Sequence, residues 1–250
     1  MKLLLLLCAL VFLVLCEASA QEISRINLPL IFETTSNPQS AYYYPSLLRR
    51  YQAHDSTMTS VDYSHLYYGY VQQPGYRPQP NTLTGEMLAQ LMEQRKYPEA
   101  KQLLSAELEK NPVSLCLTYH MAQLAYMQQD FKEERKWLTK FEGLVQAVLE
   151  SGDGLSENTA LVVISPQDEV PVLKILGLTP KASAVTVASR YDLHPLSTPN
   201  ELEAEKLYFS VEIPQQYSKA LLGNTSGGGQ NASTTSLSAK PGLDQTVRKN

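Results

Sequence analysis

Four side chains of the types used in acid–base and metal chemistry lie close together in the sequence: His54, Asp55, Asp62 and His65. Asp62 and His65 are three residues apart and would share one face of a helix, with the other two in the preceding turn. A zinc site needs three or four such ligands at about 2 Å, but this spacing matches no established metal motif. The alternative is that they form solvated caps and turns, with Asp55 capping its own turn. We expect no metal.

Tyrosines form the second group of interest, because nine of the 15 fall within residues 42–76. Exposed rings could stack on sugars or anchor a peptide. In that case the ligand-binding residues would be Tyr43, Asp55, Tyr67, Tyr68 and Tyr76. Tyrosine at helical spacing can equally build an interface between helices, where each buried hydroxyl needs one partner. The structural interpretation is favoured, since the chain has only five phenylalanines. The nine are Tyr42, Tyr43, Tyr44, Tyr51, Tyr63, Tyr67, Tyr68, Tyr70 and Tyr76.

Motifs for nucleophilic catalysis are absent from the sequence, which contains neither Gly-x-Ser-x-Gly nor His-Glu-x-x-His. Cys116 and His120 are four apart in an apolar helical stretch, where core packing is the expected role. The glycines at 227–229 have no strand pattern before them and no helix pattern after them, so no phosphate-binding loop is predicted. We expect no catalytic residues and no cofactor.

The first 20 residues have the layout of a secretory signal peptide: Lys2, an apolar run over residues 3–15, and Ala18-Ser19-Ala20. We therefore expect an exported protein, periplasmic or extracellular. No later stretch approaches the ~18 apolar residues of a membrane helix. Cleavage leaves Cys116 as the only thiol and keeps the net charge at -4, which does not favour nucleic acid.

The longest helical pattern, residues 85–150, must position the flanking segments. QRKYPEA (residues 94–100) and QQDFKEE (128–134) start 34 residues apart, which is the tetratricopeptide period. This offset aligns Tyr97 with Phe131 and Leu104 with Leu138. Two helix hairpins are predicted, with helices over residues 85–94, 98–109, 113–128 and 131–149 and with Thr84 as the first cap.

Upstream of the hairpins, alternation at Ile26, Leu28 and Leu30 predicts a short strand or strap. Tyr-rich helices over residues 45–53 and 60–68 follow, and we expect them to cover an open apolar face of the hairpins.

The limits of these helices have their own signals. Thr59 and Asp62 form a capping box, Gly69 is expected to end the helix in the left-handed conformation, and Pro74-Gly75 predicts a turn.

Downstream of a loop at residues 151–158, the helical pattern gives way to β-branched and alternating segments. Strands are predicted over residues 159–165, 182–193 and 205–213. Ser165, Pro166 and Asp168 begin a helix that Gly177 ends. A short helix at 215–222 and a disordered, Gly- and Ser-rich tail complete the chain. The expected core residues of the strands are Val185, Val187, Leu207 and Phe209.

Three phrases, YYYPSLLRRY, HDSTMTSVDYSHLYYGYV and KLYFSVEIP, resemble an exported family of Gram-negative bacteria called domain of unknown function 4919. The similarity covers residues 32–222. It implies a secreted or periplasmic α+β protein and implies no activity. His54 and Asp55 match the family pattern, whereas Gln79 follows Pro78 where the pattern has Tyr.

The sequence therefore predicts an α+β fold: tetratricopeptide-like helical hairpins followed by a small β-sheet with one packed helix. The regions are a signal peptide (1–20), a mainly helical part (21–150), a small α/β part (151–222) and a disordered tail (223–250). The expected function is a non-catalytic binding or scaffolding module for an envelope protein, peptide or glycan. The alternative is an exported hydrolase with a site near His54, Asp55, Asp62 and His65.

Overall fold

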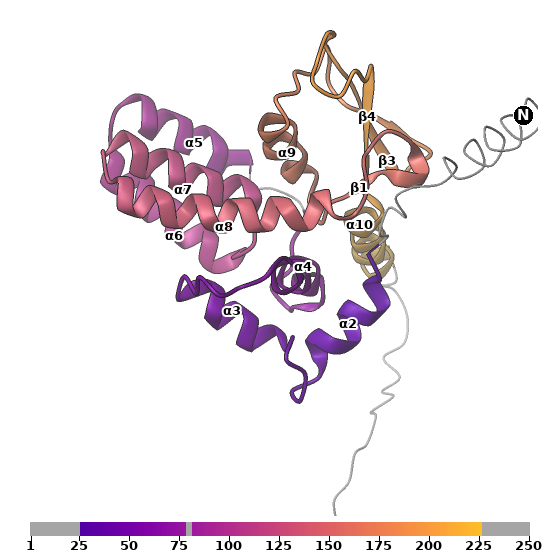
Figure 1. Cartoon of the computed structure of the whole chain (residues 1–250), viewed down its shortest axis with the longest axis horizontal. Coiled ribbons are helices and arrows are strands. Elements are labelled where there is room, and N and C mark those ends of the chain that lie inside the picture. The colour runs from indigo at the N-terminus through magenta and orange to yellow at the C-terminus, as the bar shows by residue number, and fades with distance from the viewer. Residues whose placement is uncertain (1–25, 79–81, 227–250) are drawn as a thin grey trace, which may run out of the picture.

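The computed structural model describes residues 26–78 and 82–226. The predicted signal peptide and most of the predicted tail lie outside this range. Figure 1 shows a helical part beside a small sheet, which confirms the α+β fold. None of the helices in the described ranges has the length and apolar character needed to cross a bilayer.

The helical part precedes the sheet in the chain (Figure 1). Its elements are α2 (Leu28–Ser36), α3 (Tyr44–Gln52), α4 (Ser60–Gly69), the 3-10 turn η1 (Tyr70–Gln72), α5 (Thr82–Glu93), α6 (Tyr97–Lys110), α7 (Leu115–Met127) and α8 (Phe131–Leu149).

The two predicted hairpins, α5–α6 and α7–α8, are confirmed, and they share one turn geometry. Arg95 and Gln129, which precede the second helices by two residues, are both left-handed, with φ of 55° and 59°. The second helices begin at Tyr97 and Phe131, as the repeat predicts. The cap predicted at Thr84 is wrong, because α5 begins at Thr82. Threonine and leucine both fit a first helical turn, so the pattern could not fix the first residue.

The segment from Ile26, predicted as a short strand or strap, instead forms helix α2. The side chain of Asn27 caps it, accepting from the Leu30 N–H at 3.1 Å, and a proline occupies its first turn. Its buried residues, Ile31 and Thr35, are four apart. The apparent alternation therefore belonged to a cap and a first turn.

Helices α3 and α4 and the Thr59–Asp62 capping box are confirmed. The left-handed ending at Gly69 is wrong: its φ is -63°, and the chain continues into η1. A Cβ at Gly69 would lie 2.8 Å from Thr35 Cγ2, so glycine is needed here for the close approach of α2. The predicted Pro-Gly turn follows, closed by the Tyr76 N–H donating to Gln73 O at 2.9 Å.

The second part of the chain forms a mixed sheet of order β1-β4-β3-β2, with β1 parallel to β4 and the other pairs antiparallel. Its elements are η2 (Glu157–Thr159), β1 (Leu161–Val162), η3 (Pro166–Asp168), α9 (Glu169–Ile175), β2 (Val185–Val187), β3 (Tyr191–Pro195), β4 (Lys206–Ser210) and α10 (Glu212–Ser226). The last helix starts earlier and ends later than the predicted 215–222.

Residues 182–193, predicted as one strand, hold β2, a turn and the start of β3. Ala188 and Ser189 both have φ of 52°, the left-handed pair of a tight hairpin. Val185 is 56% exposed and not a core residue, because β2 is an edge strand. Val187 is only half-buried, whereas Leu207 and Phe209 are buried as predicted.

The signals around α9 are confirmed. Ser165 accepts from the Gln167 N–H, and Pro166 opens η3, from which α9 continues. Gly177, with φ of 66°, ends the helix in the left-handed conformation.

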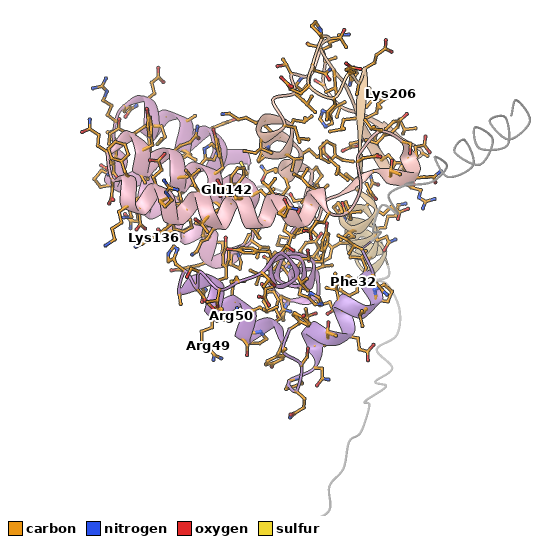
Figure 2. All side chains as sticks on the ribbon, in the orientation of Figure 1. Phe32, Arg49, Arg50, Lys136, Glu142 and Lys206 are labelled. Atoms are coloured by element: carbon orange, nitrogen blue, oxygen red, sulfur yellow. The ribbon has the colours of Figure 1, made fainter. Side chains whose placement is uncertain are left out.

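A large core joins the Tyr-rich helices, α8 and the sheet, and a smaller one lies between the hairpins. Side chains fill the space between α4 and α8 (Figure 2). Helix α4 packs against α8, as expected of a cover over the hairpins. A Cβ at Gly143 would lie 2.4 Å from the Tyr63 ring, so this glycine lets the ring lie on α8.

Candidate functional site

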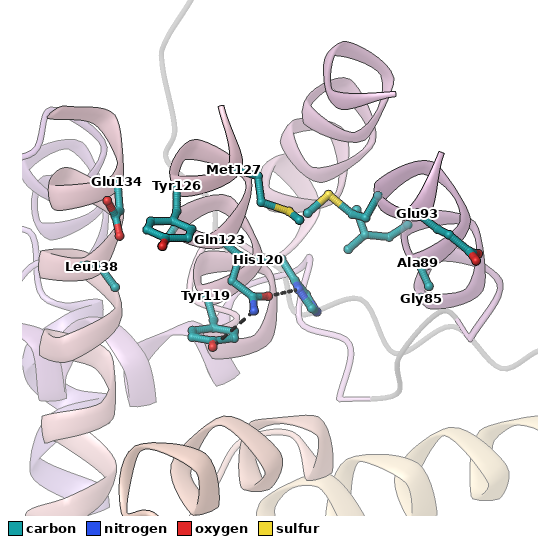
Figure 3. A pocket seen from close by; sticks show the side chains of 13 residues that line it. Gly85, Ala89, Glu93, Tyr119, His120, Gln123, Tyr126, Met127, Glu134 and Leu138 are labelled. Atoms are coloured by element: carbon teal, nitrogen blue, oxygen red, sulfur yellow. Dashed lines mark hydrogen bonds between the residues drawn. The ribbon is translucent and has the colours of Figure 1, made fainter. Parts of the chain in front are cut away.

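A groove of about 800 Å³ lies on the hairpins, between α5, α7 and α8. Figure 3 shows its side chains on three helices, with those of α7 between Glu134 and Leu138 on one side and Ala89 and Glu93 on the other. The volume is within the range of ordinary ligand sites. The lining residues are Gly85, Leu88, Ala89, Met92, Glu93, Tyr119, His120, Ala122, Gln123, Tyr126, Met127, Glu134 and Leu138.

Helical spacing explains how each helix contributes to the groove. On α7, Tyr119, Gln123 and Tyr126 recur at intervals of four and three, which places them along one face. On α5, Leu88 and Met92 do the same. Tyr126 and Met127 of α7 are 61% and 49% exposed. The groove therefore presents large apolar side chains to solvent.

Three polar side chains of α7 form a chain of hydrogen bonds along the groove (Figure 3). His120 Nδ1–H donates to Gln123 Oε1 at 3.0 Å, and Gln123 Nε2 donates to the Tyr119 hydroxyl at 3.3 Å. This order leaves His120 Nε2 as an acceptor and the Tyr119 O–H as a donor. A bound group could therefore meet one acceptor and one donor.

The electrostatics of the groove follow from its position. Burial lowers the pKa of His120 and thereby favours the neutral imidazole; the hydrogen bond to Gln123 opposes this shift and nearby Lys174 adds to it. Glu93 and Glu134 lie on opposite sides of the groove (Figure 3). The groove is thus largely apolar, with one short polar chain on α7 and a carboxylate at each of two rims.

Of the residues predicted to bind a ligand, Tyr67, Tyr68 and Tyr76 are buried in the large core. Their hydroxyls bond inward: Tyr67 to Asp168 Oδ2 at 2.8 Å, Tyr68 to Val162 O at 3.0 Å and Tyr76 to Ile164 O at 2.6 Å. None of the three rings presents a face to solvent, since each is at most 1% exposed. These tyrosines join the helical part to the sheet.

Asp55 and Tyr43 are more accessible than the buried tyrosines, and both are partly exposed. Asp55 caps its turn, accepting from the Thr57 N–H at 2.9 Å, and it pairs with Arg50 at 2.7 Å. Hydrogen bonds from Thr57 and then Arg50 lower its pKa to about 2. Tyr43 precedes α3 without a side-chain capping bond.

The remaining members of the His54–His65 group have separate structural roles. Asp62 completes the capping box and pairs with Arg50 at 3.2 Å. His65 Nδ1–H donates to Val61 O at 2.8 Å, and its ring stacks on Tyr42. His54 instead packs against Trp137. Within residues 26–78 and 82–226, no group of three or more His, Cys, Asp or Glu could hold a metal ion.

The family model Domain of unknown function (DUF4919) matches residues 29–219. The chain belongs to this family. The DUF4919 match extends from α2 into α10, so the groove lies inside it. No curated protein and no solved structure matches the chain significantly.

The residue pattern of this DUF4919 protein did not reveal the groove. Tyr119, Gln123 and Tyr126 lie in the apolar helical stretch around Cys116 and His120, for which the sequence predicts core packing. Burial raises the pKa of the half-buried Cys116 to about 11, and His120 bonds to Gln123 instead of the thiol. The signal that could have shown the groove is that α7 carries large apolar residues on more faces than one core can cover.

Proposed function

We propose that this DUF4919 protein is an exported, non-catalytic binding module whose groove holds an apolar segment of a protein partner. The leader layout of the first 20 residues supports export. The groove formed by α5, α7 and α8 carries the binding proposal. Grooves on stacked helix hairpins are a common way to hold peptides.

The chemistry of the lining favours a peptide over a glycan. A sugar is covered with hydroxyls, each of which must exchange its water for a protein partner. The groove offers the short polar chain of Tyr119, His120 and Gln123 beside side chains such as Leu88 and Met127. An apolar side chain fills such a space, and the donor and acceptor fit one peptide group.

The charges at the rims of the groove restrict the class of segment that would bind. Glu93 and Glu134 lie on either side of the groove. Complementary charges steer binding and fix its register. The preferred segment therefore has a few large apolar residues flanked by Lys or Arg.

Selection from a displayed peptide library tests this proposal with one substituted chain and one matched control. Ala89→Arg places a long charged side chain in the groove at an exposed position of α5. Ala106→Arg makes the same change at an exposed position of α6 outside the groove. Basic–apolar peptides should bind the parent chain and Ala106→Arg and should lose affinity for Ala89→Arg. Equal binding to all three, or the absence of any consensus, would refute the proposal.

A further inference from the structure

A buried lysine on α8 has no anionic partner. Lys140 is 5% exposed, and among residues 26–78 and 82–226 its ammonium makes neither a hydrogen bond nor an ion pair. It lies over the rings of Tyr51 and Trp137, with Nζ 4.6 and 4.7 Å from their centroids. A buried charge ordinarily requires a counter-charge and hydrogen bonds. The rings alone supply neither.

The ammonium faces a pocket of about 180 Å³ between α8 and the turn that joins α3 to α4. The charged basic groups of the lining are Arg135, Lys136 and Lys140, whereas burial and the neighbouring lysines lower the pKa of His54. Figure 2 shows Lys136 on the side of α8 nearer to α3. The acidic residue in the lining is Asp55, whose carboxylate is already bound by Arg50 and Thr57.

The nearby carboxylate of Glu133 is also occupied. One of its oxygens pairs with Lys136 at 3.0 Å, and the other accepts from Trp137 Nε1 at 3.1 Å. It therefore makes no direct pair with Lys140. The pocket keeps an excess of positive charge.

A second unpaired polar group lies at the same pocket. His54 Nδ1 is buried and has no hydrogen-bond partner in the described part of the chain. The residue is left-handed, with φ of 55°, a conformation that is uncommon outside glycine and that fixes where the ring lies. The centroid of its ring lies 5.8 Å from that of Trp137, and the Lys140 ammonium lies over the same indole. The imidazole and the ammonium thus flank one indole.

We propose that this pocket binds a small tetrahedral oxyanion, phosphate or sulfate, held by Lys140 with Arg135 as a further donor. The volume corresponds to roughly six water molecules at about 30 Å³ each. That admits a single oxyanion with a few waters. The site lies on the opposite side of α8 from the groove residues Glu134 and Leu138 and does not depend on the groove's function.

The chain carries its own reporter for this site. Trp137 is the one tryptophan in the sequence and contacts both Lys140 and His54. Sodium phosphate and sodium sulfate are titrated into the full chain at pH 7 against sodium chloride of equal ionic strength, and tryptophan fluorescence is recorded. A saturable change with phosphate or with both oxyanions, and not with chloride, is expected. Response to phosphate alone would assign the site to phosphate.

Variants decide whether the response comes from the pocket. Lys140→Met keeps the buried stem and removes the charge, and it should weaken oxyanion binding on the order of tenfold or more. Lys132→Met alters an exposed lysine of α8 outside the pocket and should leave binding unchanged. Arg135→Gln, at an exposed position, should weaken binding severalfold and serves if Lys140→Met does not fold. Identical titrations with phosphate and chloride, or full binding by Lys140→Met or by Arg135→Gln, would overturn the proposal.

Discussion

Tyr67→Phe removes one hydroxyl that serves two buried partners. It donates to Asp168 Oδ2 at 2.8 Å and accepts from the Ile164 N–H at 3.2 Å. Asp168 also accepts from the Leu115 N–H, the first residue of α7. The hydroxyl therefore connects α4, the end of β1 and the start of α7. The substitution should leave both partners buried and incompletely bonded.

The expected loss in the free energy of unfolding follows from these two contacts. A hydrogen bond to a charged group is worth about 1.5–3 kcal/mol, and an unpaired buried N–H costs about 1–3 kcal/mol. We expect a loss of roughly 3–5 kcal/mol at pH 8. Tyr68→Phe is the matched control, because it is equally buried on the same helix. Its hydroxyl donates to the neutral carbonyls of Ala147 and Val162 and should be worth about 1 kcal/mol.

The loss should also depend on pH. Burial raises the pKa of Asp168 to about 7 from 3.8, and donation from Tyr67 opposes that rise. Because the folded carboxyl holds its proton more tightly than the unfolded one, its contribution to stability is lost as pH rises from about 4 to 7. Without Tyr67's donation the folded pKa rises further, so the variant continues to lose stability above pH 7. The difference between parent and variant should be larger at pH 8 than at pH 5.5.

Urea denaturation followed by circular dichroism at pH 5.5 and 8 measures all three chains. Tyr67→Phe should lower the free energy of unfolding more than Tyr68→Phe does, and its loss should be largest at pH 8. Equal losses for the two substitutions, or a Tyr67→Phe loss unchanged by pH, would refute the role given to the Asp168 carboxylate.

Three further predictions concern other parts of the structure. Gly143→Ala should lower the free energy of unfolding by about 1–3 kcal/mol, because its Cβ would meet the Tyr63 ring. Gly85→Ala is the control: its Cβ would have nothing within 4 Å, so it should stabilise α5 by about 0.5–1 kcal/mol. Urea midpoints check both substitutions, and equal effects would contradict the close approach of Gly143 to Tyr63. Burial lowers the pKa of Lys140 to about 8 from 10.5, so its contribution to stability is present above pH 10.5 and lost as pH falls through 8. Parent stability relative to Lys140→Met should therefore rise from pH 7 to 9.5 in urea titrations, and a constant difference would argue against a buried ammonium. The Cys116 thiol, with its pKa raised to about 11 by burial, should react with iodoacetamide at pH 8 far more slowly in the folded chain than in urea, and equal rates would place it in solvent.

Elements with local signals could be predicted from the sequence. The Thr59–Asp62 capping box and the Ser165 cap depend on residues within three positions of each other, and both are confirmed. The hairpins could be predicted because their turns repeat at a fixed offset. The strand assigned to Ile26 failed because the start of a capped helix and a short strand have the same pattern over five residues.

The position of the tyrosines depended on partners distant in the chain. The hydroxyls of Tyr68, Tyr70 and Tyr76 donate to carbonyls of residues 162, 110 and 164. No spacing rule connects positions so far apart. The composition therefore showed that the tyrosines were unusual but left open whether they form a core or a ligand site. Only the folded structure shows that these rings are buried.

Helix α8 explains why the groove and the basic pocket can coexist on one small chain. Glu134 and Leu138 line the groove, while Arg135, Lys136 and Lys140 line the pocket on its other side. Helix α8 lies between the groove and the pocket and packs against both α7 and α4. Helix α4, which packs on α8, is in turn bonded through its tyrosines to the backbone around β1. Helix α8, which lines both sites, is therefore connected to the sheet. A helix held by this many contacts is suited to binding, since little conformational entropy is lost when a ligand enters a preformed site.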